Sequence, residues 1–277
     1  MSLKHYPNLI ELSGFPFPVY ASAGTEQRAQ SIAVRCQNAH NFLGSTFKFE
    51  PQLCVLVLTA EQWNEYATFP VYGMPHYTDE RTLAVAGQDN RFWQSMTPPA
   101  EALPPQAAQA MQAAYGQPDG SINLSPFFDL LAVHELGHLF QLQAQCQFPR
   151  LWLTELFCNI CLHAYVVAVE AERLPALETF PQMVANLGVA ELRYRNLDDF
   201  ERLYTDVGAQ NYGWYQCRFH VAAKHIYEAG GVEALQRLWK AFLQADEKPS
   251  DEQLAARLRE DVHPEVERVL TAWSASC

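Results

Sequence analysis

The sequence feature that most constrains this chain is His134-Glu135-Leu136-Gly137-His138, which lies inside an apolar pattern with helical spacing. The apolar residues recur from residue 125 to about 142, so we expect a helix there, with Ser125 as its N-cap and Pro126 in its first turn. Residues four apart lie one turn apart on the same face of a helix, so two imidazoles can reach one metal ion at about 2.0–2.1 Å. The pattern therefore predicts a buried helix that carries metal ligands.

Glu135 follows the first histidine and lies about 100° further round the helix. It cannot share the row of ligands, but it can contact a water on the metal as a general base. At this histidine frequency, a chance match in a chain of this length occurs about once or twice in a hundred chains. The alternative is a pair of core histidines whose nitrogens are satisfied by hydrogen bonds.

Two imidazoles leave a zinc ion short of a third protein ligand. No histidine stands six residues after His138, where another class of zinc site would need one, and Glu155 is the better candidate. We expect Glu155 in the first turn of a second helix, from about Thr154 to Glu172, antiparallel to the first, with Asn159 on the same face as a hydrogen-bond partner for a ligand. The alternative is that Glu155 only stabilises the helix terminus.

The motif at His134–His138, together with Trp152-Leu153-Thr154-Glu155, resembles the gluzincin metallopeptidases, which include aminopeptidase N and thermolysin. The resemblance implies a zincin-like, thermolysin-type α+β catalytic domain with one Zn²⁺ ion. It implies that His134, His138 and Glu155 hold the zinc, that Glu135 is the general base, and that Tyr215 stabilises the oxyanion, with Tyr212 as the alternative.

The same families place an edge strand beside the cleft to pair with the substrate backbone, and the candidate here is Arg81–Ala86. Aminopeptidases carry before that strand a motif whose glutamate binds the free amine of the substrate. Gly73-Met74-Pro75-His76-Tyr77 stands at that place and contains no glutamate, so endo- and exo-action both stay open.

We expect one domain over residues 1–277, with a mixed α/β sheet region up to about residue 120 and a helical region after it. Leu53–Thr59 is a continuous apolar run that predicts a central strand. In the helical region, Pro175 and Pro181 predict interruptions, and the pair Gly230-Gly231 predicts the end of a helix that begins near residue 210.

Composition excludes some partners. The formal net charge of −12 argues against nucleic acid and against anionic membranes, and no apolar run approaches the ~18 residues of a membrane span. Seven cysteines, an odd number without regular spacing, favour reduced thiols and a cytoplasmic protein, and Met1–Gly14 lacks the pattern of a signal peptide. Cys158 and Cys161 are interpreted as small apolar helix residues.

These observations predict a zinc-dependent hydrolase, a metallopeptidase that acts on a peptide or protein substrate. Two alternatives stay open: a non-catalytic binding module that retains a zincin core, and a zinc hydrolase of non-peptide amides or esters. The sequence leaves the oligomeric state and the side-chain preference open.

Overall fold

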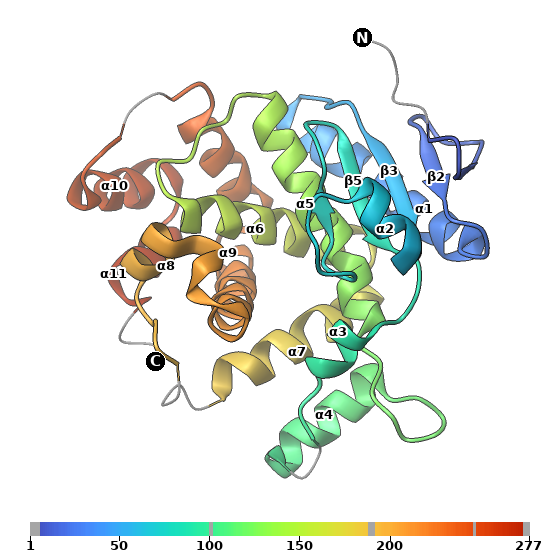
Figure 1. The fold of residues 1–277 in the computed structure, drawn as a ribbon. Coiled ribbons are helices and arrows are strands. Elements are labelled where there is room, and N and C mark those ends of the chain that lie inside the picture. The colour runs from blue at the N-terminus through green and yellow to red at the C-terminus, as the bar shows by residue number, and fades with distance from the viewer. Residues whose placement is uncertain (1–5, 100–101, 188–191, 246–247, 274–277) are drawn as a thin grey trace. The chain divides into compact units, whose positions relative to one another are not determined.

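The computed structural model describes residues 6–99, 102–187, 192–245 and 248–273 (Figure 1). Contacts between residues divide the chain into two compact units. The first contains residues 1–45 and 49–140, and the second contains residues 46–48 and 141–277. We expected a change from a mixed sheet to helices near residue 120. The boundary between the two units lies later, between residues 140 and 141.

The first unit is built on a sheet in the order β1-β2-β3-β5-β4. Strands β2, β3 and β5 are parallel, while β1 and β4 are antiparallel edges. The strands are β1 Ile10–Glu11, β2 Val19–Ala21, β3 Cys54–Leu58, β4 His76–Tyr77 and β5 Thr82–Ala86. The central position predicted for the Leu53–Thr59 run is confirmed, because β3 pairs on both sides and its apolar side chains fill the core.

The edge position predicted for Arg81–Ala86 is wrong. The strand there, β5, pairs with β3 on one side and with β4 on the other, and all its residues are buried. The edge strand is β4, which comes from the Gly73–Tyr77 segment itself. Sequence could not reveal this because a two-residue strand leaves no alternation to detect.

Helices connect and cover these strands, and the most apolar of them is α5. Its side chains are buried almost all round, as in a core helix. The helices of this part of the chain are α1 Glu26–Phe47, α2 Ala60–Tyr66, α3 Arg91–Ser95, α4 Pro105–Tyr115 and α5 Ser125–Gln143.

The N-terminus of α5 differs in one detail from the expected cap. Ser125 is already the first helical residue, and the side chain of Asn123 accepts from its backbone N–H at 2.8 Å. Further contacts hold the first turns of α5. Arg28 of α1 pairs with Asp129, and Trp93 of α3 stacks on Phe128 with ring centroids 5.1 Å apart.

The second unit is helical wherever the structure describes regular elements. Helix α6 packs against α9, and α7 packs against α9 as well. Its elements are α6 Leu151–Val169, η2 Ala171–Arg173, α7 Leu174–Asn186, α8 Leu197–Leu203, η3 Tyr204–Val207, α9 Ala209–Phe242, α10 Asp251–Arg257, η4 Leu258–Val262 and α11 Pro264–Thr271.

Two expectations for this unit need comment. The interruptions predicted at Pro175 and Pro181 are wrong, because α7 contains both residues. Pro175 lies in the first turn, where its missing N–H has no helical partner to lose, and packing of α7 on α9 compensates for Pro181. The break predicted at the glycine pair is confirmed, since Gly231 has φ 57° and ψ −157° between two helical segments of α9.

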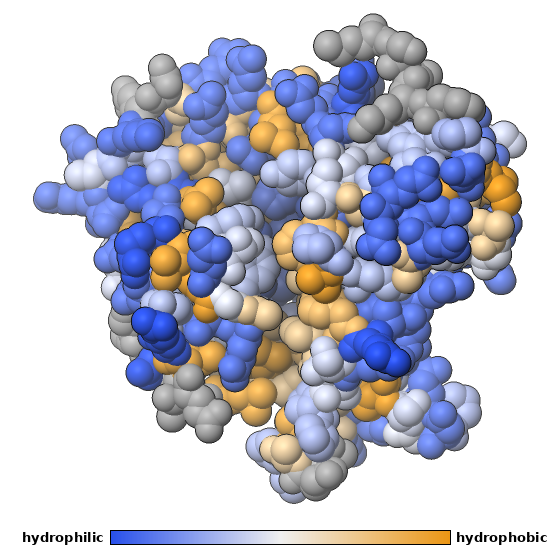
Figure 2. Space-filling view, viewed as in Figure 1, coloured by the Kyte–Doolittle hydropathy of each residue, from blue (hydrophilic) through white to orange (hydrophobic). Residues whose placement is uncertain are grey.

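Helix α6 is long and apolar enough to cross a membrane by length and composition alone. However, 78% of its apolar window is buried inside the structure, and Glu155, Asn159 and His163 are polar members of the helix. Hydrophilic residues cover much of the molecular face drawn in Figure 2, with hydrophobic residues in smaller areas. These features are typical of a core helix.

His76, which begins β4, holds the loop before that strand through its imidazole. Its Nε2 accepts hydrogen bonds from the backbone N–H groups of Thr68 and Phe69 at 3.1 and 3.2 Å. The proton is therefore on Nδ1, which donates to the carbonyl oxygen of Met74 at 3.0 Å. Burial lowers the pKa of His76 from its ordinary value of 6.5, so the ring is held neutral.

We expect His76 to make the protein less stable as the pH falls below 6.5. The unfolded chain takes up a proton near pH 6.5, whereas the folded ring does so only at lower pH, so its stabilisation is full above 6.5 and is lost on acidification. A His76→Gln variant should lose about 1–3 kcal/mol at pH 8, from two hydrogen bonds, and should show a flatter pH dependence. Urea unfolding at pH 8, 7, 6 and 5 measures both effects. Parallel pH curves for variant and wild type would contradict this prediction.

Candidate metal centre and the residues around it

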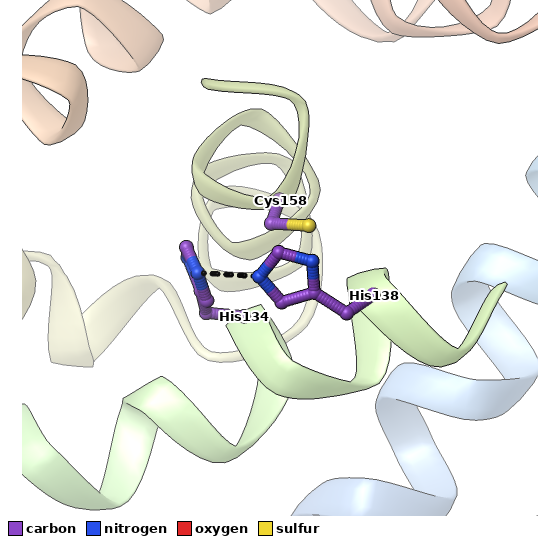
Figure 3. Close-up of side chains that lie close together, drawn as sticks. All are labelled: His134, His138 and Cys158. Atoms are coloured by element: carbon purple, nitrogen blue, oxygen red, sulfur yellow. Dashed lines mark hydrogen bonds between the residues drawn. The ribbon is translucent and has the colours of Figure 1, made fainter. Parts of the chain in front are cut away.

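The two histidines of the motif lie on successive turns of α5, and their imidazoles approach each other (Figure 3). The Nε2 atoms are 3.2 Å apart, and the ring centroids are 5.0 Å apart with planes at 72°. Two ligand atoms that sit tetrahedrally about one zinc ion, each at 2.0–2.1 Å, are about 3.3 Å from each other. The same distance is that of a hydrogen bond between the two rings, so the spacing fits both a shared metal ion and a hydrogen-bonded pair of histidines.

The two histidines and the glutamate between them in the sequence differ in burial. His134 and His138 are 6% and 7% exposed, whereas Glu135 is only partly buried. This follows from helical geometry, because Glu135 lies about 100° further round the helix than its neighbour. Its side chain therefore lies off the helix face that carries the two imidazoles.

Tyr77, a residue that sequence analysis did not single out, also contacts the motif. It lies on the edge strand β4, and its ring centroid is 5.5 Å from that of His138. Tyr77 is 39% exposed, so the contact places a partly accessible aromatic side chain beside one imidazole. Only the pairing of β4 with β5 brings this residue to α5, since it is 61 positions before His138 in the sequence.

Glu155 belongs to α6 of the second unit, but not to its first turn. The helix begins at Leu151, because Glu201 of α8 accepts a hydrogen bond from the Leu151 backbone N–H at 2.7 Å and caps the helix. Glu155 therefore lies in the second turn and is 2% exposed. The prediction that Glu155 lies in the first turn was wrong, because the residue that caps the helix, Glu201, is 50 positions after Leu151 in the sequence.

Both carboxylate oxygens of Glu155 accept hydrogen bonds. The Tyr204 hydroxyl donates to Oε1 at 2.7 Å, and Gln216 Nε2 donates to Oε2 at 2.7 Å. Gln216 Nε2 also lies 3.0 Å from the hydroxyl oxygen of Tyr212. We call Glu155, Tyr204, Tyr212 and Gln216 the Glu155 cluster. We expected Asn159 to hydrogen-bond a metal ligand. Its Nδ2 instead donates to Gln216 Oε1 at 3.4 Å, and Gln216 in turn contacts Glu155.

Tyr204 stays protonated in this cluster. Burial, followed by the negative charge of Glu155 and the neighbouring Tyr212, raises its pKa far above the ordinary value of 10.0. A protonated phenol can only donate toward a carboxylate, so the direction of the hydrogen bond to Oε1 is settled. Sequence reasoning missed Tyr204, and no periodic signal could have found it, because it begins the short element η3 directly after the short helix α8.

Tyr215 has the contacts of a core residue. It is fully buried, its hydroxyl donates to the backbone carbonyl of Asn196 at 2.6 Å, and its ring stacks on Trp273 with planes at 10°. Tyr212, the alternative that the sequence left open, is partly exposed and belongs to the Glu155 cluster.

The predicted site residues are divided between the two units. His134, Glu135 and His138 belong to the first, while Glu155 and both tyrosine candidates belong to the second. The set of His134, His138 and Glu155 as ligands of one ion therefore stays a prediction. Cys158, the third side chain drawn in Figure 3, lies three residues after Glu155 on α6 and is buried, as is Cys161.

Comparisons of this chain with protein-family models, with curated proteins and with solved structures find no match.

Proposed function

We propose that this chain is a zinc-dependent metallohydrolase with a zincin-like, thermolysin-type catalytic domain, and that it cleaves peptide bonds. The observation that carries the proposal is the pair of buried imidazoles of His134 and His138 on α5. Their Nε2 atoms lie 3.2 Å apart, and Glu135 stands between the two histidines in the sequence. A core pair that shares a hydrogen bond would have the same spacing, but it has no need of a glutamate between the two histidines in the sequence.

Glu155 enters the proposal as the third ligand through its place in the sequence, seventeen positions after His138 on the next helix. Its local environment supports this role. The carboxylate is buried and held by two hydrogen-bond donors, as ligating carboxylates commonly are. Two imidazoles and one carboxylate form a nitrogen-and-oxygen set that suits zinc and leaves a position for water.

When bound to these residues, zinc would supply a Lewis acid that lowers the pKa of a water toward ~7. The Glu135 carboxylate takes a proton from the attacking water as it adds to the carbonyl carbon. It then delivers that proton to the leaving nitrogen as the C–N bond breaks, which yields a carboxylic acid and an amine. Water is the only co-reactant.

A tyrosine hydroxyl is proposed to donate to the oxyanion of the tetrahedral intermediate. The contacts within the second unit favour Tyr212 over Tyr215 for this role. The Tyr215 hydroxyl is buried and donates to the Asn196 carbonyl, while Tyr212 is partly exposed.

Metal analysis of the purified chain, combined with cleavage of a fluorogenic peptide library, tests the function. We expect about one zinc per chain, cleavage that a chelator abolishes, and recovery of cleavage on addition of Zn²⁺. The matched control is the double variant His134→Ala/His138→Ala, which should retain no zinc. A wild-type chain that binds no zinc in equilibrium dialysis would overturn the proposal. Zinc binding with cleavage of ester or non-peptide amide substrates alone would overturn the assignment to peptides.

A further inference from the structure

Both oxygens of the Glu155 carboxylate accept hydrogen bonds, and the two donors belong to two other elements. Tyr204 reaches Oε1 from the start of η3, and Gln216 reaches Oε2 from α9. Two donors on two different oxygens define the plane of a carboxylate as well as its position, whereas one donor would leave it free to rotate.

The backbone at Tyr204 is unusual for a bulky residue. Its φ of 48° with ψ of −115° lies at positive φ, where β-branched and aromatic residues are rarely found. Its ring is held edge-on by Phe200 and Tyr212, with centroids 5.5 and 5.8 Å away. Surrounding contacts thus maintain a disfavoured backbone conformation that points the phenol at Glu155.

We propose that Tyr204 and Gln216 are positioning residues that fix the plane of the Glu155 carboxylate for metal binding. The proposal rests on the proposed function, in which Glu155 is a zinc ligand. Neither residue is assigned to the metal itself. By holding the carboxylate in one orientation before the ion arrives, they remove the need to order it on binding, so their effect is on zinc affinity.

The test is zinc affinity of the full-length apo-protein, measured by competition with a chromophoric chelator. Tyr204→Phe removes one hydroxyl and keeps the ring between Phe200 and Tyr212, while Gln216→Met removes the other donor at similar volume. We expect each substitution to raise the Kd for Zn²⁺ by about 10- to 100-fold, the range found for outer-shell partners of metal ligands. If Tyr204→Phe does not fold, the Gln216→Met result decides the proposal.

The chain offers a matched control in Tyr165→Phe. Tyr165 is a buried residue of α6, and its hydroxyl donates a hydrogen bond to Glu170 Oε1 at 2.5 Å. This variant therefore also removes a phenol–carboxylate hydrogen bond from the second unit. It should leave the Kd for Zn²⁺ unchanged.

Three results would speak against the proposal, and they differ in what else they reject. If Glu155→Ala raises the Kd but neither Tyr204→Phe nor Gln216→Met does, positioning is wrong and the proposed function survives. If Tyr165→Phe raises the Kd as much as Tyr204→Phe, the effect is general destabilisation and positioning is again wrong. If the wild-type protein binds no zinc, the proposed function fails together with this inference.

Discussion

A Glu135→Gln variant is expected to keep its zinc and to lose at least two orders of magnitude in kcat. An amide cannot accept the proton of the attacking water, and general-base catalysis contributes typically 10²–10⁴-fold. Zinc should remain because Glu135 lies about 100° round the helix from the ligand row, outside the pair of imidazoles. Peptide hydrolysis under saturating substrate, with metal content measured on the same sample, gives both quantities.

Asp129→Asn provides the matched control for this variant. It makes the same acid-to-amide change on the same helix, six residues before Glu135, at a residue whose partner is Arg28 of α1. It should lower stability modestly and leave kcat within a few-fold of wild type. Hydrolysis by Glu135→Gln at the wild-type rate would remove the general-base assignment, and loss of zinc from Glu135→Gln would place this glutamate among the ligands.

A Glu155→Ala variant is expected to lose zinc more severely than any outer-shell variant, with a Kd raised by more than about 100-fold. In the proposed site, the substitution removes one of three protein ligands of the zinc ion. The apo-protein should also lose about 1–3 kcal/mol of stability, because Tyr204 and Gln216 are left without their acceptor. Equilibrium dialysis against zinc and urea unfolding of the apo-protein separate the two effects.

Cys158→Ala is the comparison that tests which side chain of α6 belongs to the proposed ligand set. Cys158 follows Glu155 by three residues on the same helix, and both side chains are buried. We expect its removal to leave the zinc content unchanged. The opposite pattern, with zinc lost from Cys158→Ala and kept by Glu155→Ala, would replace the carboxylate by a thiolate in the ligand set.

Where sequence reasoning succeeded, the signal was local. The run at Leu53–Thr59 marked β3 because a strand buried on both faces needs continuous apolar residues. Gly231 breaks α9 because its backbone adopts a positive φ that other residues disfavour. Each of these features depends on residues close together in the chain.

Where it failed, a distant residue decided the local structure. Glu201 starts α6 three residues earlier than Thr154, and packing on α9 keeps α7 continuous through Pro181. The edge strand was assigned to the wrong segment because β4 is defined by its pairing with β5 and not by its own two residues.

The sequence by itself determined that His134 and His138 share one face of a buried helix and that Glu135 points elsewhere, since the helical repeat sets these directions within five residues. Tertiary structure alone decided what holds Glu155. Its two donors, Tyr204 and Gln216, are 49 and 61 positions away along the chain. No periodicity links residues at such separations, and only the packing of α9 against both α6 and η3 brings them to the same carboxylate.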